Sequence, residues 1–190
     1  MSRERSNRAE WLLTVSVVAA VAAGLVGMRV FTRAAERRQH EQAAQVSRLA
    51  GLELIGQPAA PVDFILDRDT VRFPVTGAPA LLYVRNEECT PCERTERDLR
   101  SFLRNPLAGD PGLWVLSEAG TDEARVAFSE FPQVRVGRAA DLRGFAHAYQ
   151  VRQVPFLALV SADGRIQRVR VGDARGFDLR GFVRGSAIRP

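Results

Sequence analysis

The chain has 190 residues, enough for one ordinary domain and an accessory segment, and its 46% hydrophobic and 26% charged residues exclude a disordered protein. All 27 basic residues are arginine, and they are spread along the whole length. Because a nucleic-acid surface needs basic residues clustered on one face, we expect no nucleic-acid partner.

The first predicted element is a membrane anchor. After a charged tail over residues 1–10, residues 11–28 (WLLTVSVVAAVAAGLVGM) contain no charge over a length that suits a membrane-spanning helix. A cleaved signal peptide is the alternative, since Ala20 and Ala22 have the spacing of a cleavage site, but the apolar run continues for six more residues. We therefore expect an uncleaved anchor. Arginines flank it on both sides, so charge alone leaves its orientation open.

A polar segment separates the anchor from a folded domain. Residues 29–55 are rich in Ala, Glu, Gln and Arg, which predicts a helical spacer whose helix ends at Gly51. The stretch GQPAAP at 56–61 combines Pro and Gly, which favour a break in regular structure. We therefore place the start of the domain, residues 56–190, at this break.

The domain alternates strand patterns with helical patterns. Strands are predicted at 62–66, 70–74, 80–84, 112–116, near Val134 and on both sides of the turn signal Asp163-Gly164; helices are predicted at 89–103, from Thr121, at 140–149 and at 178–183. This order predicts an α/β fold that ends in a hairpin and a last helix.

The two cysteines of the chain, Cys89 and Cys92, lie where the buried strand 80–84 gives way to a helix. Free N–H groups and the dipole at a helix N-terminus stabilise a thiolate, and Pro91 is tolerated in the first turn. This position predicts a redox pair in which Cys89 is the exposed attacking thiol and Cys92 resolves the mixed disulfide. Four glutamates in the same stretch oppose thiolate formation: Glu87, Glu88, Glu93 and Glu96.

Two other uses of the cysteine pair are an unreactive buried pair and a zinc site. A structural zinc site needs four ligands at characteristic local spacing. The two histidines, His40 and His147, lie far from the pair along the chain, and His147 fits a helix of the domain better than a ligand. We therefore expect no metal and no other cofactor.

The order of these motifs resembles the thioredoxin superfamily: a strand, a C-x-x-C pair that opens a helix, and later Val154-Pro155 before a strand and a D-G hairpin. The stretch GQPAAPVDFILDRDTVRFPVTGAPALLYV resembles membrane-anchored thioredoxin-like proteins of the TlpA and ResA type. LRGFAHAYQVRQVPFLALVSADGRI is similar to the MauD accessory proteins of methylamine dehydrogenase maturation. The resemblance covers about residues 56–185. It implies a thioredoxin-like fold, with a central mixed sheet flanked by helices, preceded by one N-terminal transmembrane helix.

The resemblance also implies roles for individual residues. Cys89 and Cys92 match the redox pair, Pro155 matches a cis-proline beside it, and the backbone of Val154 matches the group that binds an extended substrate segment. The chain departs from the family pattern at three positions near the pair: Glu88 replaces an aromatic residue, Tyr83 replaces a buried acid, and Thr95, with Glu96 beside it, replaces the glutamate of ResA-like proteins. These departures concern substrate recognition and proton transfer rather than the dithiol itself.

The function implied is that of a thiol-disulfide oxidoreductase anchored in the inner membrane through residues 11–28, with its domain in the periplasm. It would reduce disulfides of extracytoplasmic client proteins, as in cytochrome c maturation, and a membrane electron donor would recharge it. A dedicated MauD-like maturation factor and a non-catalytic thioredoxin-like binding module are the alternatives. A peroxidase is not favoured, because the pattern P-x-x-x-T-x-x-C precedes neither cysteine.

Overall fold

The computed structural model describes residue 28 and residues 51–66, 69–118, 121–172 and 177–185. The N-terminal tail, the predicted anchor apart from Met28 and most of the spacer lie outside these residues, so they stay predictions. Within the described ranges, no helix is both long enough and apolar enough to cross a membrane.

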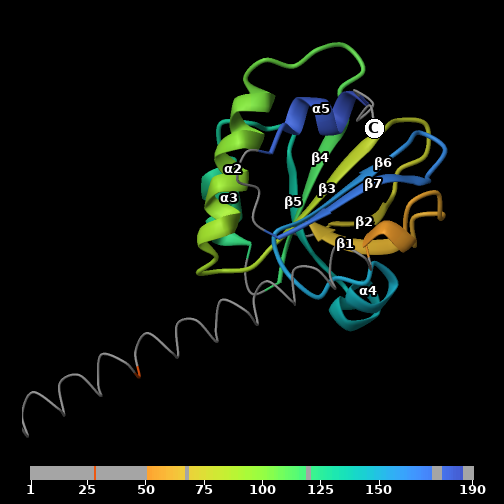
Figure 1. The fold of residues 1–190 in the computed structure, drawn as a ribbon, viewed down its shortest axis with the longest axis horizontal. Coiled ribbons are helices and arrows are strands. Elements are labelled where there is room, and N and C mark those ends of the chain that lie inside the picture. The colour runs from red at the N-terminus through yellow and green to blue at the C-terminus, as the bar shows by residue number, and fades with distance from the viewer. Residues whose placement is uncertain (1–27, 29–50, 67–68, 119–120, 173–176, 186–190) are drawn as a thin grey trace, which may run out of the picture. The chain divides into compact units, whose positions relative to one another are not determined.

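Seven strands of the described residues form one sheet in the order β2-β1-β5-β4-β3-β6-β7 (Figure 1). Their bounds are Val62–Leu66 (β1), Asp69–Phe73 (β2), Ala80–Arg85 (β3), Gly112–Ser117 (β4), Arg135–Ala139 (β5), Phe156–Val160 (β6) and Ile166–Val171 (β7). β4 pairs in parallel with β3 and β5, whereas the other neighbours pair antiparallel. The predicted mixed sheet is confirmed.

The central strands β3 and β6 are buried along their whole length. Strands covered on both faces have continuous apolar sequences, which explains the runs ALLYV and FLALV. β1 lies nearer the edge of the sheet and begins with alternation, since Val62 and Phe64 are buried and Asp63 is exposed.

Helices cover both faces of the sheet (Figure 1). Their bounds are Thr90–Leu103 (α2), Asp122–Ala127 (α3), Leu142–Ala148 (α4) and Leu179–Arg184 (α5). Side chains of α2, α3 and α5 share one core cluster with Leu81 and Leu157 of the sheet. Phe145 of α4 joins the cluster on the opposite face, with Phe64 and Trp114. Each large apolar side chain buried in this way contributes roughly 1.5–3 kcal/mol.

The predicted elements are found in the predicted order, with small shifts at their ends. α4 begins at Leu142 rather than at Ala140, because Asp141 caps it and accepts a hydrogen bond from the N–H of Gly144 at 2.9 Å. The hairpin turn is confirmed, and Gly164 in it has a φ of +80°, which glycine adopts readily.

The prediction that a helix ends at Gly51 is wrong, because residues 51–53 are still helical. A Cβ at Gly51 would lie 2.9 Å from Cγ1 of Val169 on β7, so the missing side chain permits close packing rather than a helix end. The left-handed residue comes later, at Gly56, with a φ of +84°. Leu54 between them is buried in the core, so this segment packs with the sheet.

Candidate redox site

The cysteine pair lies just beyond the carboxyl end of β3. A short loop with Glu88 at a φ of +53° leads from Arg85 to Cys89, which is the N-cap residue of α2. The Sγ atom of Cys89 accepts a hydrogen bond from the N–H of Cys92 at 3.2 Å, as a serine oxygen would at this position. Cys89 and Cys92 form a disulfide. The structure therefore brings together the two cysteines that the sequence predicted to act together.

The two cysteines differ in exposure. Cys92 is completely buried and belongs to the core cluster beneath α2, α3 and α5. Cys89 is only partly buried and packs at the border of the same cluster. A disulfide of another protein can approach Cys89, whereas Cys92 is shielded by the domain.

The Val154-Pro155 peptide bond is cis, as the resemblance implied. Val154 is partly buried and packs against the same core cluster as the two cysteines. The carbonyl of Pro155 accepts a hydrogen bond from the N–H of Gly172 at 2.8 Å. Among the described residues, none forms a backbone hydrogen bond with the N–H or the carbonyl of Val154.

A buried polar network, which the sequence analysis did not predict, lies beside Cys92. The hydroxyl of Tyr83 on β3 is 3.2 Å from the backbone carbonyl of Cys92 and 3.2 Å from Oε1 of Glu96. The same Oε1 atom is 3.0 Å from Nε of Arg85, the last residue of β3. Nη2 of Arg85 is 2.9 Å from Oε2 of Glu123 on α3. Arg85 and Glu96 are 4% and 6% exposed, so this is a buried ion pair.

Burial dominates the electrostatics of this network. It raises the pKa of the Glu96 carboxyl above its usual value, and the neighbouring Arg85 guanidinium and the hydrogen bond from Tyr83 offset part of that rise. Burial also raises the pKa of the Tyr83 hydroxyl, and the charge of Glu96 raises it further. Tyr83 therefore stays a neutral hydroxyl at every pH at which the protein would work.

The four glutamates around the cysteines fall into two groups. Glu87, Glu88 and Glu93 are exposed to solvent, whereas Glu96 is buried. The signal for this difference is helical spacing: Glu96 lies four residues after Cys92 and three before Leu99, on the buried face of α2. Thr95, at the position that ResA-like proteins give to glutamate, donates its hydroxyl to the carbonyl of Pro91 at 3.2 Å.

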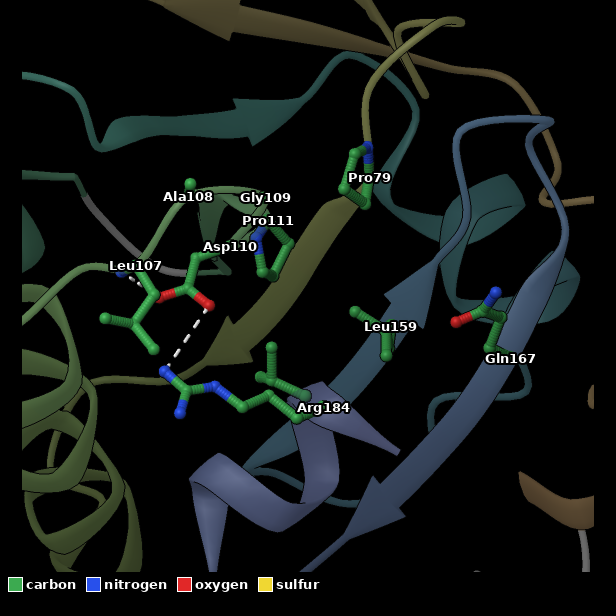
Figure 2. A pocket seen from close by; sticks show the side chains of 10 residues that line it. Pro79, Leu107, Ala108, Gly109, Asp110, Pro111, Leu159, Gln167 and Arg184 are labelled. Atoms are coloured by element: carbon green, nitrogen blue, oxygen red, sulfur yellow. Dashed lines mark hydrogen bonds and ion pairs between the residues drawn. The ribbon is translucent and has the colours of Figure 1, made fainter. Parts of the chain in front are cut away.

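A separate cavity of about 460 Å³ lies at the other end of the central strands (Figure 2). Pro79 and Pro111, which line it, precede β3 and β4, whereas Cys89 follows the carboxyl end of β3. Asp110 and Arg184 form an ion pair of 3.8 Å on its wall. The cavity is therefore not part of the cysteine site.

Two of the solved structures with a similar fold are described as thiol-disulfide proteins. The thioredoxin domain of a thiol-disulfide oxidoreductase from Bacteroides vulgatus aligns with a TM-score of 0.53 at 17% identity, over 68% of this chain and 97% of that one. A thiol:disulfide interchange protein from Bacteroides sp. aligns with a TM-score of 0.52 at 16% identity, over 70% and 93%. No protein-family model and no curated protein sequence matches the chain. The described residues therefore have a thioredoxin-like fold, with the Cys89–Cys92 disulfide at the N-terminus of α2.

Proposed function

We propose that this chain is a thiol-disulfide oxidoreductase that acts on disulfides of other proteins. The observation that carries the proposal is the placement of the pair: Cys89 is partly exposed at a helix N-terminus, and Cys92 is buried beside it. The helix N-terminus stabilises the thiolate of Cys89, and its exposure lets a partner reach it. The thiol-disulfide chemistry of the structures with this fold supports the same assignment.

The reaction has two exchange steps. The Cys89 thiolate attacks one sulfur of a partner disulfide, so that a bond forms between the two proteins and the second partner sulfur leaves as a thiolate. Cys92 then loses its proton and attacks Sγ of Cys89, which re-forms the Cys89–Cys92 disulfide, breaks the bond between the two proteins and releases the partner sulfur that was bonded to Cys89. The partner is reduced and the pair is oxidised. A dithiol donor must return two electrons and two protons before the next cycle.

Val154 and Pro155 are the proposed binding residues for the partner. The Val154 backbone has an N–H and a carbonyl without backbone partners among the described residues, and it packs on the same core cluster as the cysteines. An extended partner segment would satisfy both groups in the manner of a β-strand. The segment would then present its disulfide to Cys89.

The proposed cellular setting rests on the apolar run near the N-terminus and on the resemblance to membrane-anchored thioredoxin-like proteins. Residues 11–28 would anchor the chain in the inner membrane, with the domain in the periplasm, where client disulfides persist. A membrane electron donor would keep the pair reduced, and the clients would resemble those of cytochrome c maturation. A MauD-like factor dedicated to methylamine dehydrogenase is the second candidate, because of the similarity around Val154-Pro155; a non-catalytic binding module is the third.

Trapping tests the reaction and the assigned roles. Cys92→Ser should accumulate a mixed disulfide through Cys89, because the attacking thiol remains and the resolving one is gone. The matched control Cys89→Ser should trap much less, since its remaining thiol is buried. Non-reducing electrophoresis of the full-length chain from membranes would show the complexes. Equal trapping by both variants would contradict the assigned roles, and a wild type without any exchange activity would favour the binding module.

A further inference from the structure

The proposed function, on which this inference rests, leaves open which side chains help the Val154 backbone to hold a partner segment. When an extended segment is bound as an added strand, main-chain hydrogen bonds supply affinity and neighbouring side chains add to it. Gln153 directly precedes Val154 and is partly exposed. Its side chain is therefore a candidate for the second contribution.

Strand pairing places Gln153 at the cysteine end of the sheet. Phe156 at the start of β6 pairs with Val84 near the end of β3 and with Val171 at the end of β7. The turn before Phe156 and the residue after Val171 therefore lie at the end of the sheet from which the chain continues to Cys89. Gln153 belongs to that turn.

The side chain of Gln153 packs against Gly172, which follows β7. A Cβ at Gly172 would lie 3.6 Å from Nε2 and 3.8 Å from Oε1 of Gln153, which are ordinary contact distances. Gly172 has a φ of +81° and donates its N–H to the carbonyl of Pro155 at 2.8 Å. The end of β7 therefore supports both the cis-proline turn and the Gln153 carboxamide.

The two edges of this carboxamide differ. Oε1 is buried and has no hydrogen-bond partner. Nε2 also has no acceptor among the described residues, but it is open to solvent. A buried polar atom without a partner destabilises a fold, and an apolar side chain of the same shape would avoid that cost. A carboxamide at this position therefore indicates a use other than folding.

We propose that Gln153 is a partner-binding residue, whose Nε2 donates a hydrogen bond to a backbone carbonyl of the extended segment bound along Val154. Nε2 is the open edge of the carboxamide, and every polypeptide segment carries backbone carbonyls whatever its sequence. The contact with Gly172 holds the carboxamide in place. The favoured substrates are therefore disulfides within an extended polypeptide, whereas small disulfides without a peptide backbone gain nothing from Gln153.

Two probes with the same leaving group isolate this contact in the full-length chain, purified in detergent and reduced beforehand. The first is a small symmetric aromatic disulfide whose thiolate is coloured. The second is a short extended peptide with one cysteine joined through a disulfide to the same aromatic thiol. Attack by Cys89 on either probe releases the coloured thiolate, which is the better leaving group. Only the peptide probe offers backbone carbonyls to Gln153.

Gln153→Met should slow thiolate release from the peptide probe by about three- to tenfold, because one hydrogen bond to the partner is lost. Release from the aromatic probe should not change. Gln153→Asn, which keeps the donor on a shorter side chain, should fall between Gln153→Met and wild type. The matched control is Gln167→Met, which changes an exposed glutamine at the separate cavity (Figure 2) and should leave both rates unchanged.

Urea unfolding shows whether each variant is folded. Gln153→Met replaces an oxygen that has no partner by an apolar group, so it should be at least as stable as wild type. Gln153→Ala, whose side chain is smaller, takes its place if methionine does not fit. A folded variant that reacts with the peptide probe as fast as wild type would overturn the inference.

Equal slowing with both probes would also overturn it, because Gln153 would then only shape the site. A wild type that releases no thiolate from either probe would instead contradict the proposed function.

Discussion

The two faces of the sheet are built differently. On the α4 face, the core is aromatic and apolar: Phe64 and Phe73 pack against Trp114 with ring centroids 5.2 Å and 5.3 Å apart. On the face covered by α2, α3 and α5, the apolar core is interrupted at one end by the buried pair Arg85 and Glu96, next to Cys92. We expect the aromatic face to contribute most of the stability, and the other face to contribute less because it holds a buried ion pair beside the cysteines.

The largest expected effect on stability is on the aromatic face. Trp114→Ala should lower the free energy of unfolding by about 3–5 kcal/mol, because a side chain only 4% exposed leaves a cavity between two phenylalanines. Urea unfolding of the oxidised protein would measure this change. The rate of disulfide exchange per folded molecule should not change, since Trp114 belongs to the cluster opposite the cysteines.

Trp114→Phe is the matched control, because it keeps a ring at the same position and should lose much less stability. The division between the faces would be wrong if Trp114→Ala slowed exchange in the folded fraction as strongly as it weakened folding. Exchange rates therefore have to be measured at a temperature and urea concentration at which the variant is folded.

On the other face, replacing the buried ion pair by apolar residues should have the opposite effect on stability. Arg85→Met with Glu96→Leu removes the cost of keeping two charges out of water, so the free energy of unfolding should stay the same or rise by about 1–4 kcal/mol. The rate of disulfide exchange should nevertheless fall, because the ion pair lies next to Cys92. Each single change should destabilise, because it leaves a buried charge with a weaker set of partners.

Urea unfolding and the rate of disulfide exchange would be measured on the same preparations. A double variant that is clearly less stable than wild type would show that the pair is there for stability. A double variant that is stable and exchanges disulfides as fast as wild type would show that the charges do not serve the reaction.

The sequence predicted the fold and the cysteines because their signals are local. The continuous apolar run of β3, the Asp163-Gly164 turn and the C-x-x-C pair at the start of α2 each depend on residues close together in the chain. The structure also places Val154 against the cluster that contains the cysteines. The local features needed no knowledge of the order of strands, whereas the place of Val154 was implied by the resemblance alone.

The buried ion pair was not predicted because it depends on packing between distant residues. Glu96 lies among three other glutamates that are exposed, and its charge alone does not distinguish it from them. In the sequence, Arg85 fits the solvent-exposed end of a strand. Only the packing of α3 places Glu123 beside it. The helix end predicted at Gly51 is wrong for the same reason. The close packing that Gly51 permits is against Val169, which is far away in the sequence.

The smallest expected effect concerns the exposed acids of the loop before Cys89. Glu87 and Glu88 are exposed, so their repulsion of the Cys89 thiolate is screened, and each should contribute less than about 1 kcal/mol. The helix N-terminus favours that thiolate while these acids oppose it. A site whose thiolate is penalised acts as a reductant, so we expect a reduction potential of roughly −270 to −220 mV rather than the approximately −120 mV of strong oxidants.

Glu87→Gln with Glu88→Gln should raise this potential by about 10–30 mV, because loss of the two charges stabilises the reduced, thiolate-containing form. Equilibration of the full-length chain with dithiothreitol or glutathione buffers would measure both potentials. Glu130→Gln, which removes an exposed acid paired with Arg104, is the matched control and should change nothing. High salt should shrink the difference, since it screens exposed charges but not the buried pair. A double variant that becomes more reducing, or a wild type near −120 mV, would show that the acids of this loop do not set the direction of electron flow.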